Sequence, residues 1–154
     1  MTLNWSKATM DNAALLWRWA NDPETRRNAF DQSPIPYDTH LVWLQDQLAS
    51  PATRWWIFAD TEGPVGQVRF ELAGEVAIID ITVAPERRGR GHGRAMLTQA
   101  VHNLRDERGT EVRPRAAVLA HNPRSLAMFR ACGFVPVGIE RRDGKEATVL
   151  ELPP

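Results

Sequence analysis

The sequence holds a single cysteine, Cys132, among its 154 residues, so no disulfide can form within the chain. Lysine is almost as scarce, because only Lys7 and Lys145 among the 19 basic residues are lysines. The formal net charge of +0 at pH 7 provides no overall field that would draw the chain to nucleic acid or to an anionic membrane. We therefore expect neither a nucleic-acid partner nor a membrane partner.

Long apolar runs are missing as well. No stretch approaches the roughly 18 apolar residues that a membrane span requires. Residues 1–10 are polar and lack the apolar segment of a signal peptide. These absences favour a cytoplasmic protein. The length and the hydrophobic content of 43% fit one globular domain over residues 1–154, and they leave a homodimer open.

The first third of the chain predicts a strand at residues 3–7 and two helices. Asp11 and Asp38 are the expected N-caps of these helices, because short polar side chains accept hydrogen bonds from the first free amides. Asn21-Asp22-Pro23 ends the first helix, since the residue before proline avoids helical geometry. Apolar residues then recur at helical spacing in each helix: Ala13, Leu16, Trp19 and Ala20, then Leu41, Leu44 and Leu48.

Turn residues divide the next segment into strands at residues 54–60, 65–72 and 75–83, which reads as an antiparallel meander. Its last strand is apolar from residue 76 to 83 apart from Asp80 and Thr82, and this favours a central strand covered on both faces.

The last third predicts a helix at residues 91–108, a strand at 112–120 and a helix at 122–133. Pro114 must lie at the start of its strand or at an unpaired position. A hairpin follows, with strands at 134–139 and 146–152 joined through Asp143-Gly144. The predicted fold is α/β, with a mixed, mostly antiparallel central sheet of about seven strands and helices on both faces.

Residues 81–94 (ITVAPERRGRGHGR) form the most informative segment, because a buried strand enters a basic, glycine-rich turn and then a helix. Glycines let the backbone approach a ligand, and the first amides of a helix are unpaired and positively polarised. With Arg88, Arg90 and Arg94 these amides predict a phosphate site. The segment lacks the Lys-Ser/Thr of a P-loop and the glycine spacing of a Rossmann fingerprint. A solvated loop and an RNA-binding patch are the alternatives on these residues alone.

Arg88-x-x-Gly91-x-Gly93 resembles the acetyl-CoA signature of the GNAT acetyltransferase superfamily, written (R/Q)-x-x-G-x-(G/A). A second stretch, Asn122-x-x-Ser125-x-x-x-Phe129-x-x-x-Gly133-Phe134, is similar to the second cofactor segment of that superfamily. The resemblance covers most of the chain, from about residue 3 to residue 139. It implies an acyltransferase that moves an acetyl group from acetyl-CoA to a primary amine, by direct attack in a ternary complex and without a metal. A peptide N-terminal acetyltransferase and a catalytically weak CoA-binding module are the alternatives.

The resemblance also implies which residues hold the co-substrate. Backbone amides of the glycine turn would bind the CoA pyrophosphate, and the preceding strand would pair with the pantetheine arm. Many relatives have a tyrosine at the position of Phe129 that protonates the leaving thiolate; here water or Ser125 would have to substitute. The implied cofactor-binding residues are Ile81, Thr82, Val83, Arg88, Gly89, Arg90, Gly91, His92, Gly93, Arg94, Asn122 and Phe129, with helix capping as a second role for Asn122.

A base must remove a proton from the acceptor, because only a neutral amine attacks a thioester. Asp80 is the first candidate, as a lone acid in an apolar strand, and His40 is the second. For Asp80 the alternatives are a hydrogen-bonded structural role or a side chain that points to solvent at a sheet edge, and for His40 the alternative is a packing role. His121 and Glu75 remain open, whereas His92 lies on the phosphate turn and is a poor base.

The amino-terminal segment carries the clues to the acceptor. Residues 15–26 (LLWRWANDPETR), with Ile35-x-x-x-x-His40-x-x-Trp43, resemble a subgroup that acetylates nucleotide-linked amino sugars, as in pseudaminic acid biosynthesis. That subgroup is similar to the ribosomal-protein N-terminal acetyltransferases. This chain has Ala20 where the subgroup has an arginine. Cys132, at the end of its helix, is badly placed as an acyl carrier. The expected acceptor-binding residues, with core packing as the alternative, are Trp17, Asn21, Phe30 and Trp43.

Overall fold

The structure is a computed structural model that describes residues 2–154. It contains the strands β1 (Asn4–Lys7), β2 (Thr53–Asp60), β3 (Gly63–Ala73), β4 (Val76–Val83), β5 (Arg113–Leu119), β6 (Val135–Arg142) and β7 (Lys145–Glu151). Its α-helices are α1 (Ala13–Ala20), α2 (Pro23–Arg27), α3 (Tyr37–Ala49), α4 (His92–Arg108) and α5 (Pro123–Ala131).

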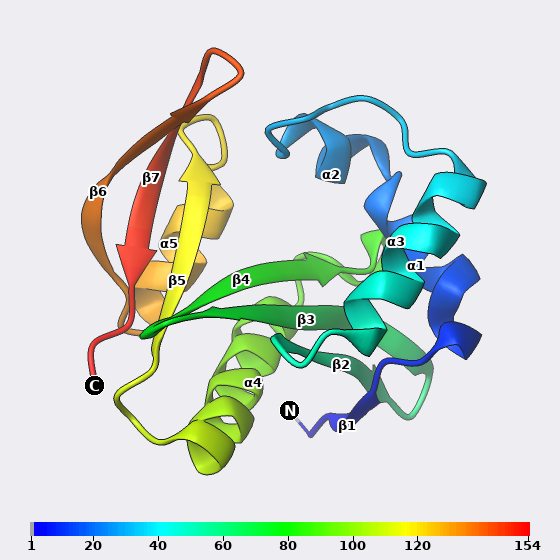
Figure 1. Cartoon of the computed structure of the whole chain (residues 1–154), viewed down its shortest axis with the longest axis horizontal. Coiled ribbons are helices and arrows are strands. Elements are labelled where there is room, and N and C mark those ends of the chain that lie inside the picture. The colour runs from blue at the N-terminus through cyan, green and yellow to red at the C-terminus, as the bar shows by residue number, and fades with distance from the viewer. Residues whose placement is uncertain (1) are drawn as a thin grey trace.

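The strands form one sheet in the order β1-β2-β3-β4-β5-β7-β6 (Figure 1). Every neighbouring pair is antiparallel except β4 and β5. The meander of β2, β3 and β4 and the final hairpin of β6 and β7 are both present. The prediction of an α/β fold with a mixed, mostly antiparallel sheet is therefore confirmed.

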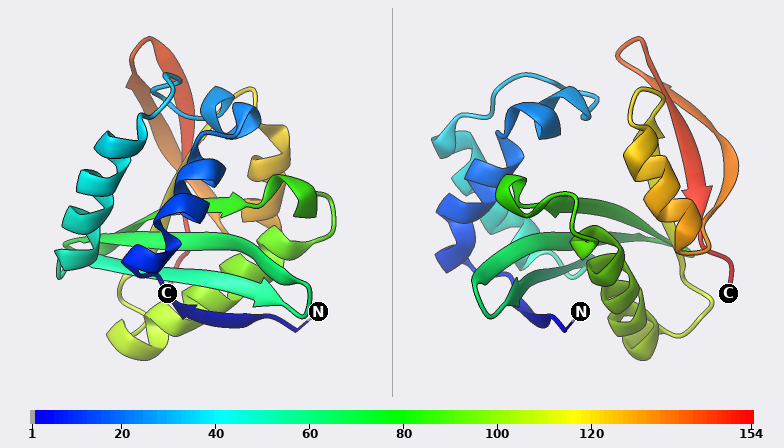
Figure 2. Two further views of the ribbon diagram at one scale, coloured as in Figure 1. Left: turned by 90° about the vertical axis from the view of Figure 1, so that its right-hand side faces the viewer. Right: turned by 180° about the vertical axis from the view of Figure 1, so that it is seen from behind.

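Helices cover both faces of the sheet, and Figure 2 shows α4 on the face opposite α1 and α3. Alternation along β2 explains this arrangement, because successive side chains of a strand point to opposite faces. Trp56 and Phe58 join the core against α4, whereas Trp55 and Ile57 join a second core with α1 and α3. Each core is apolar, so burial holds both layers of helices on the sheet.

The strands β4 and β5 pair over only three residues and then diverge, as Figure 1 shows. Val76, Ala77 and Ile78 lie opposite Arg113, Pro114 and Arg115. Beyond Ile78, β4 keeps its antiparallel pairing with β3 up to Val83, while its other edge has no strand beside it.

The position of β4 corrects one expectation. The strand is central in the sheet, but it is not covered on both faces, because Asp80 is exposed and Ile78 is 45% exposed. The reason is that the pairing with β5 ends at Ile78, which leaves open space beside this part of β4.

The expected N-caps of the first two helices are wrong. Thr9 caps the amino-terminal turn instead, since its side chain accepts from the Asp11 amide at 3.2 Å while Asn12 accepts from the Thr9 amide at 2.9 Å. This reciprocal pair of hydrogen bonds is a capping box, and its cap residue, Thr9, lies two residues before Asp11. Pro36 precedes α3, and Asp38 lies inside its first turn.

Local signals in the second half of the chain are confirmed. Gly91 takes a left-handed conformation (φ +81°) directly before α4, and Asn122 caps α5 by accepting from the Ser125 amide at 3.3 Å. Asp143 and Gly144, with φ of 52° and 74°, form the hairpin turn. Pro114 is the second residue of β5, near the start of that strand as expected. No helix within residues 2–154 is long and apolar enough to cross a membrane.

The close contact of β3 with β4 depends on a glycine. A Cβ atom on Gly66 would lie 2.3 Å from the Thr82 carbonyl oxygen and 2.6 Å from the Met96 side chain. We predict that Gly66→Ala destabilises the fold by about 1–3 kcal/mol, because overpacking forces the backbone of the two strands apart. Urea unfolding measures this loss.

Gly138→Ala is the matched control, since a Cβ there meets no atom within 4 Å. Equal unfolding midpoints for Gly66→Ala and Gly138→Ala would contradict the predicted constraint at Gly66.

Candidate active site

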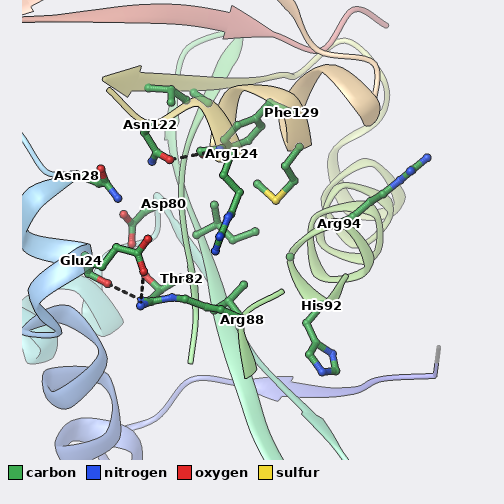
Figure 3. Close-up of a pocket in the computed structure, with 18 of the residues that line it drawn as sticks. Glu24, Asn28, Asp80, Thr82, Arg88, His92, Arg94, Asn122, Arg124 and Phe129 are labelled. Atoms are coloured by element: carbon green, nitrogen blue, oxygen red, sulfur yellow. Dashed lines mark hydrogen bonds and ion pairs between the residues drawn. The ribbon is translucent and has the colours of Figure 1, made fainter. Parts of the chain in front are cut away.

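A cavity of about 670 Å³ lies where β4 and β5 diverge. Its walls come from the unpaired half of β4, the middle of β5, the turn before α4, the first part of α5, and α2 with the residues after it (Figure 3). The backbone of β4 from Ile79 to Val83 therefore presents a free strand edge to the cavity. An extended ligand can add to such an edge as a further strand.

The glycine-rich turn forms one end of this cavity. Gly89 and Gly91 have φ of +77° and +81°, which side chains other than glycine rarely adopt. Within residues 2–154, the amides of residues 89–91 donate no backbone hydrogen bond outside helices and strands. Together with the first amides of α4 they form a group of unpaired donors at a helix N-terminus, which suits a phosphate.

The side chain of Arg88 does not add its charge to this turn as expected. Its guanidinium makes an ion pair with Glu24 at 2.8 Å (Figure 3). It makes a second ion pair with Asp22 at 2.8 Å and donates to the Thr25 hydroxyl at 3.1 Å. The charge of Arg88 is thus neutralised inside the protein, and the side chain fixes α2 to the turn. Only the backbone of Arg88 remains available as a donor.

Asp22 has two partners that both stabilise its ionised form. Burial by itself raises the pKa of Asp22, but the hydrogen bonds from Arg88 and from the Thr25 amide outweigh this effect and lower the pKa overall. Asp22 therefore caps α2 and anchors Arg88 at the same time.

The other expected cations also lie differently. Arg90 is exposed and does not line the cavity. Arg94 does line it, with a side chain that points away from Asp80 and Asn122 (Figure 3). Arg124, which sequence reasoning missed, extends from α5 into the cavity between the two diverging strands (Figure 3). Its position in the first turn of a helix that starts at a predicted cofactor segment was the available signal.

Two more residues from the predicted cofactor set line the cavity with distinct surroundings. Phe129 is 2% exposed and packs edge-to-face on Phe134, with the ring centres 5.0 Å apart, so the surrounding side chains fix its ring. His92 is buried, its Nδ1 has no hydrogen-bond partner among the described residues, and its ring points away from Asp80 (Figure 3). The half-buried Cys132 lines no cavity.

Asp80 lies at the boundary of two cavities. A second cavity of about 590 Å³ adjoins the first, and both are lined by Asn28, Ala29, Ile79, Asp80 and Ala117. Asp80 is thus the one carboxylate, within residues 2–154, that faces both spaces.

A buried chain of hydrogen bonds fixes the Asp80 carboxylate. The side-chain nitrogen of Gln67 donates to Asp80 Oδ2 at 2.9 Å and to Thr82 Oγ1 at 3.0 Å. The side-chain oxygen of Gln67 accepts from Trp55 Nε1 at 2.7 Å. Gln67 is only 4% exposed, so the chain positions Asp80 without covering it.

His40 is not brought to the site. It is 2% exposed, lies between Tyr37 and Trp43, and lines neither cavity. Burial lowers the pKa of His40, so the ring stays neutral at pH 7. The other open candidates, His121 and Glu75, also lie outside both cavities.

Of the four residues expected to bind the acceptor, only Phe30 lines a cavity, namely the second. Trp17 Nε1 donates to the backbone carbonyl of Ile35 at 2.8 Å. The side-chain oxygen of Asn21 accepts from the backbone N–H of Ile35 at 2.7 Å. These two side chains hold the loop before α3 against α1. Trp43 is 40% exposed, packs edge-to-face on Trp55 and lines neither cavity.

A model of the acetyltransferase (GNAT) family matches residues 13–134. The L-2,4-diaminobutyric acid acetyltransferase of Nocardia farcinica is 28% identical over 148 residues, which cover 93% of this chain and 66% of that protein. The chain thus spans about two thirds of the length of this relative. Among the described residues, no group of three or more His, Cys, Asp or Glu side chains could hold a metal ion.

Solved structures share the fold at low sequence identity. A chimera of the Vibrio cholerae spermidine N-acetyltransferase superposes with a TM-score of 0.85 at 16% identity, over 99% of this chain and 96% of that one. The Vibrio cholerae spermidine N-acetyltransferase in complex with CoA and spermine gives a TM-score of 0.82 at 16% identity, over 97% and 94% of the two chains.

We predict that Asp22→Asn lowers the free energy of unfolding by about 1–3 kcal/mol, because Arg88 loses a charged hydrogen-bond partner. The folded pKa of Asp22 lies below its unfolded value, so the unfolded chain binds more protons. The difference between wild type and variant is then complete above about pH 4 and shrinks as the pH falls through the lowered pKa. Urea unfolding between about pH 7 and about pH 2.5 measures this difference.

Glu24→Gln serves as the control, since Glu24 is 44% exposed and its pair with Arg88 is more accessible to water. Parallel pH profiles for wild type and Asp22→Asn would contradict this account.

Proposed function

The chain belongs to the acetyltransferase (GNAT) family, and on that premise we propose that it is an N-acetyltransferase whose acceptor is the primary amine of a small molecule. The observation that carries the proposal is the meeting of two cavities at Asp80. The first cavity has a free strand edge and the glycine-rich turn with its unpaired amides, and the second is lined by charged residues such as Arg69 and Glu71. Two substrates can therefore approach each other across Asp80.

Acetyl-CoA fits the first cavity by its chemistry. The free edge of β4 offers backbone groups to the amides of pantetheine, and the turn at residues 89–91 offers unpaired amides to the pyrophosphate. Arg124 supplies the positive side chain that Arg88 does not. Phe129 closes the cavity near α5 and has no hydroxyl for proton transfer.

The acceptor occupies the second cavity in this proposal. Its volume of about 590 Å³ suits a small molecule. The relatives support this choice, because the curated one is named for diaminobutyric acid and a solved one contains spermine. The aromatic rings expected to stack on a sugar lie elsewhere, apart from Phe30, so an amino sugar becomes one member of the assay panel and peptide amino termini another.

Transfer proceeds by direct attack. The amine nitrogen bonds to the thioester carbonyl carbon, the carbon–sulfur bond breaks, and CoA leaves as the thiolate. The acceptor ammonium loses two protons in all. The first passes to Asp80, directly or through one water, before attack, since Asp80 is exposed and held by Gln67. The second leaves the nitrogen of the tetrahedral intermediate and passes to water. Cys132 takes no part. One domain over the whole chain, a cytoplasmic location and a homodimer stay predictions.

We predict that Gly91→Val raises the dissociation constant for acetyl-CoA by about tenfold or more, because a side chain there blocks the approach of the pyrophosphate and strains a left-handed residue. Isothermal titration calorimetry measures the constant. Gly74→Val is the control, since Gly74 also has a positive φ (+63°) but lies in the turn between β3 and β4 outside the cavities. Unchanged affinity in folded Gly91→Val would refute this placement.

We predict that Asp80→Asn lowers kcat by about 10²–10⁴-fold while the affinity for acetyl-CoA stays within about twofold. Asparagine keeps an oxygen for the Gln67 hydrogen bond and removes only the charge and the basicity. Steady-state assays of CoA release measure the loss. Asp46→Asn, on the exposed side of α3, is the matched control. A kcat close to that of the wild type in Asp80→Asn would show that Asp80 has a structural role and is not the base.

A further inference from the structure

Three arginines line the second cavity, and one of them differs from the others in its partners. Arg115 is paired with Glu151, and Arg142 is paired with Glu140. Arg69 makes no ion pair with any residue from 2 to 154. Among these three arginines, Arg69 is therefore the one whose positive charge the described part of the protein leaves without an ion-pair partner.

The guanidinium of Arg69 is packed beside two aromatic rings and is partly removed from water. It lies 5.1 Å from the centre of the Trp43 ring and 5.4 Å from that of Trp55, so two aromatic rings flank it. Its Nε is buried without a hydrogen-bond partner, and Nη1 makes only a long contact of 3.4 Å with Gln47. A guanidinium ordered in this way loses little entropy when it binds a planar carboxylate.

Arg69 lies directly opposite Asp80 in the pairing of β3 with β4. Residues opposite each other on neighbouring strands point to the same face with Cα atoms about 4.5–5.5 Å apart. Both side chains line the second cavity, so a positive and a negative group stand side by side there. A small zwitterion presents the complementary pair.

We propose that the acceptor is an amine that also carries a carboxylate, and that Arg69 binds this carboxylate while Asp80 faces the amine. The inference rests on the proposed function and specifies its substrate class as amino acids with a second amine, rather than diamines or polyamines. Arg69 is then the residue that determines specificity. A polyamine would place a second ammonium beside the uncompensated guanidinium, where like charges repel.

Glu71 is a further charged residue of β3 that lines the second cavity. Glu71 follows Arg69 by two residues on β3, lines the same cavity, and has no ion pair within the described residues. Glu71 lies opposite Ile78 in the pairing of β3 with β4, whereas Arg69 lies opposite Asp80. Glu71 is therefore farther than Arg69 from the boundary between the two cavities. Glu71 can hold a second ammonium of the acceptor, which fits a diamino acid as the substrate class.

The test uses pairs of amines that differ only by the carboxylate: diaminobutyrate against diaminopropane, ornithine against putrescine, and lysine against cadaverine. Acetyl transfer is followed by CoA release, and the product is confirmed by mass spectrometry. Wild-type protein is expected to prefer the acid member of at least one pair by about 10–100-fold in kcat/KM, as a charged hydrogen bond provides. This comparison does not depend on the folding of any variant.

Arg69→Met is expected to remove the preference by lowering kcat/KM for the acid, while transfer to the matching diamine is retained or raised. Methionine keeps a long side chain between the two tryptophans but has no charge. Arg69→Lys should restore part of the preference, because the charge returns without the planar fork. Arg141→Met is the matched control, since Arg141 is 81% exposed and lies outside both cavities.

Two results would overturn the inference alone and leave the proposed function intact. Diamines acetylated as well as or better than their acid partners are the first, and an acid preference that survives in Arg69→Met is the second. Binding of acetyl-CoA without transfer to any small amine would overturn the proposed function, and the inference with it.

Discussion

The structure depends on the short pairing of β4 with β5. Three paired residues join the two halves of the sheet, and beyond them each strand is held only by its outer neighbour, β3 or β7. The backbone groups on the inner edge of β4 have no partner in the sheet, and such groups need one from water or a ligand. The cavity, its glycine-rich end and the exposed face of Asp80 all follow from this divergence.

The glycine-rich turn at the end of this cavity is also held by α2. Arg88 connects the turn to Asp22 and Glu24, which lie more than 60 residues earlier in the sequence. The amino-terminal helices thereby become a wall of the cavity. The motif arginine serves the phosphate site indirectly, by placing the backbone that presents the amides.

The sequence predicted those features whose signals are local. Gly91, Asn122 and the Asp143-Gly144 turn each fix a boundary through their own backbone preference, so the helices and the hairpin after β4 were placed correctly. The choice between Thr9 and Asp11 as a cap depends on where the chain first turns, which spacing alone does not decide. The partners of Arg88 and the isolation of Arg69 arise from strand register and helix packing, so no local pattern could reveal them.

The two cavities bind by different parts of the same strands. The first uses the backbone edge of β4, which is present whatever side chains the strand carries, whereas the second uses side chains of β3 and β4 that face one side of the sheet. Exchange of a residue such as Arg69 therefore leaves the backbone edge unaltered. In evolutionary terms, a lineage built on this sheet can acquire new acceptors by point mutation while its donor site is inherited unchanged.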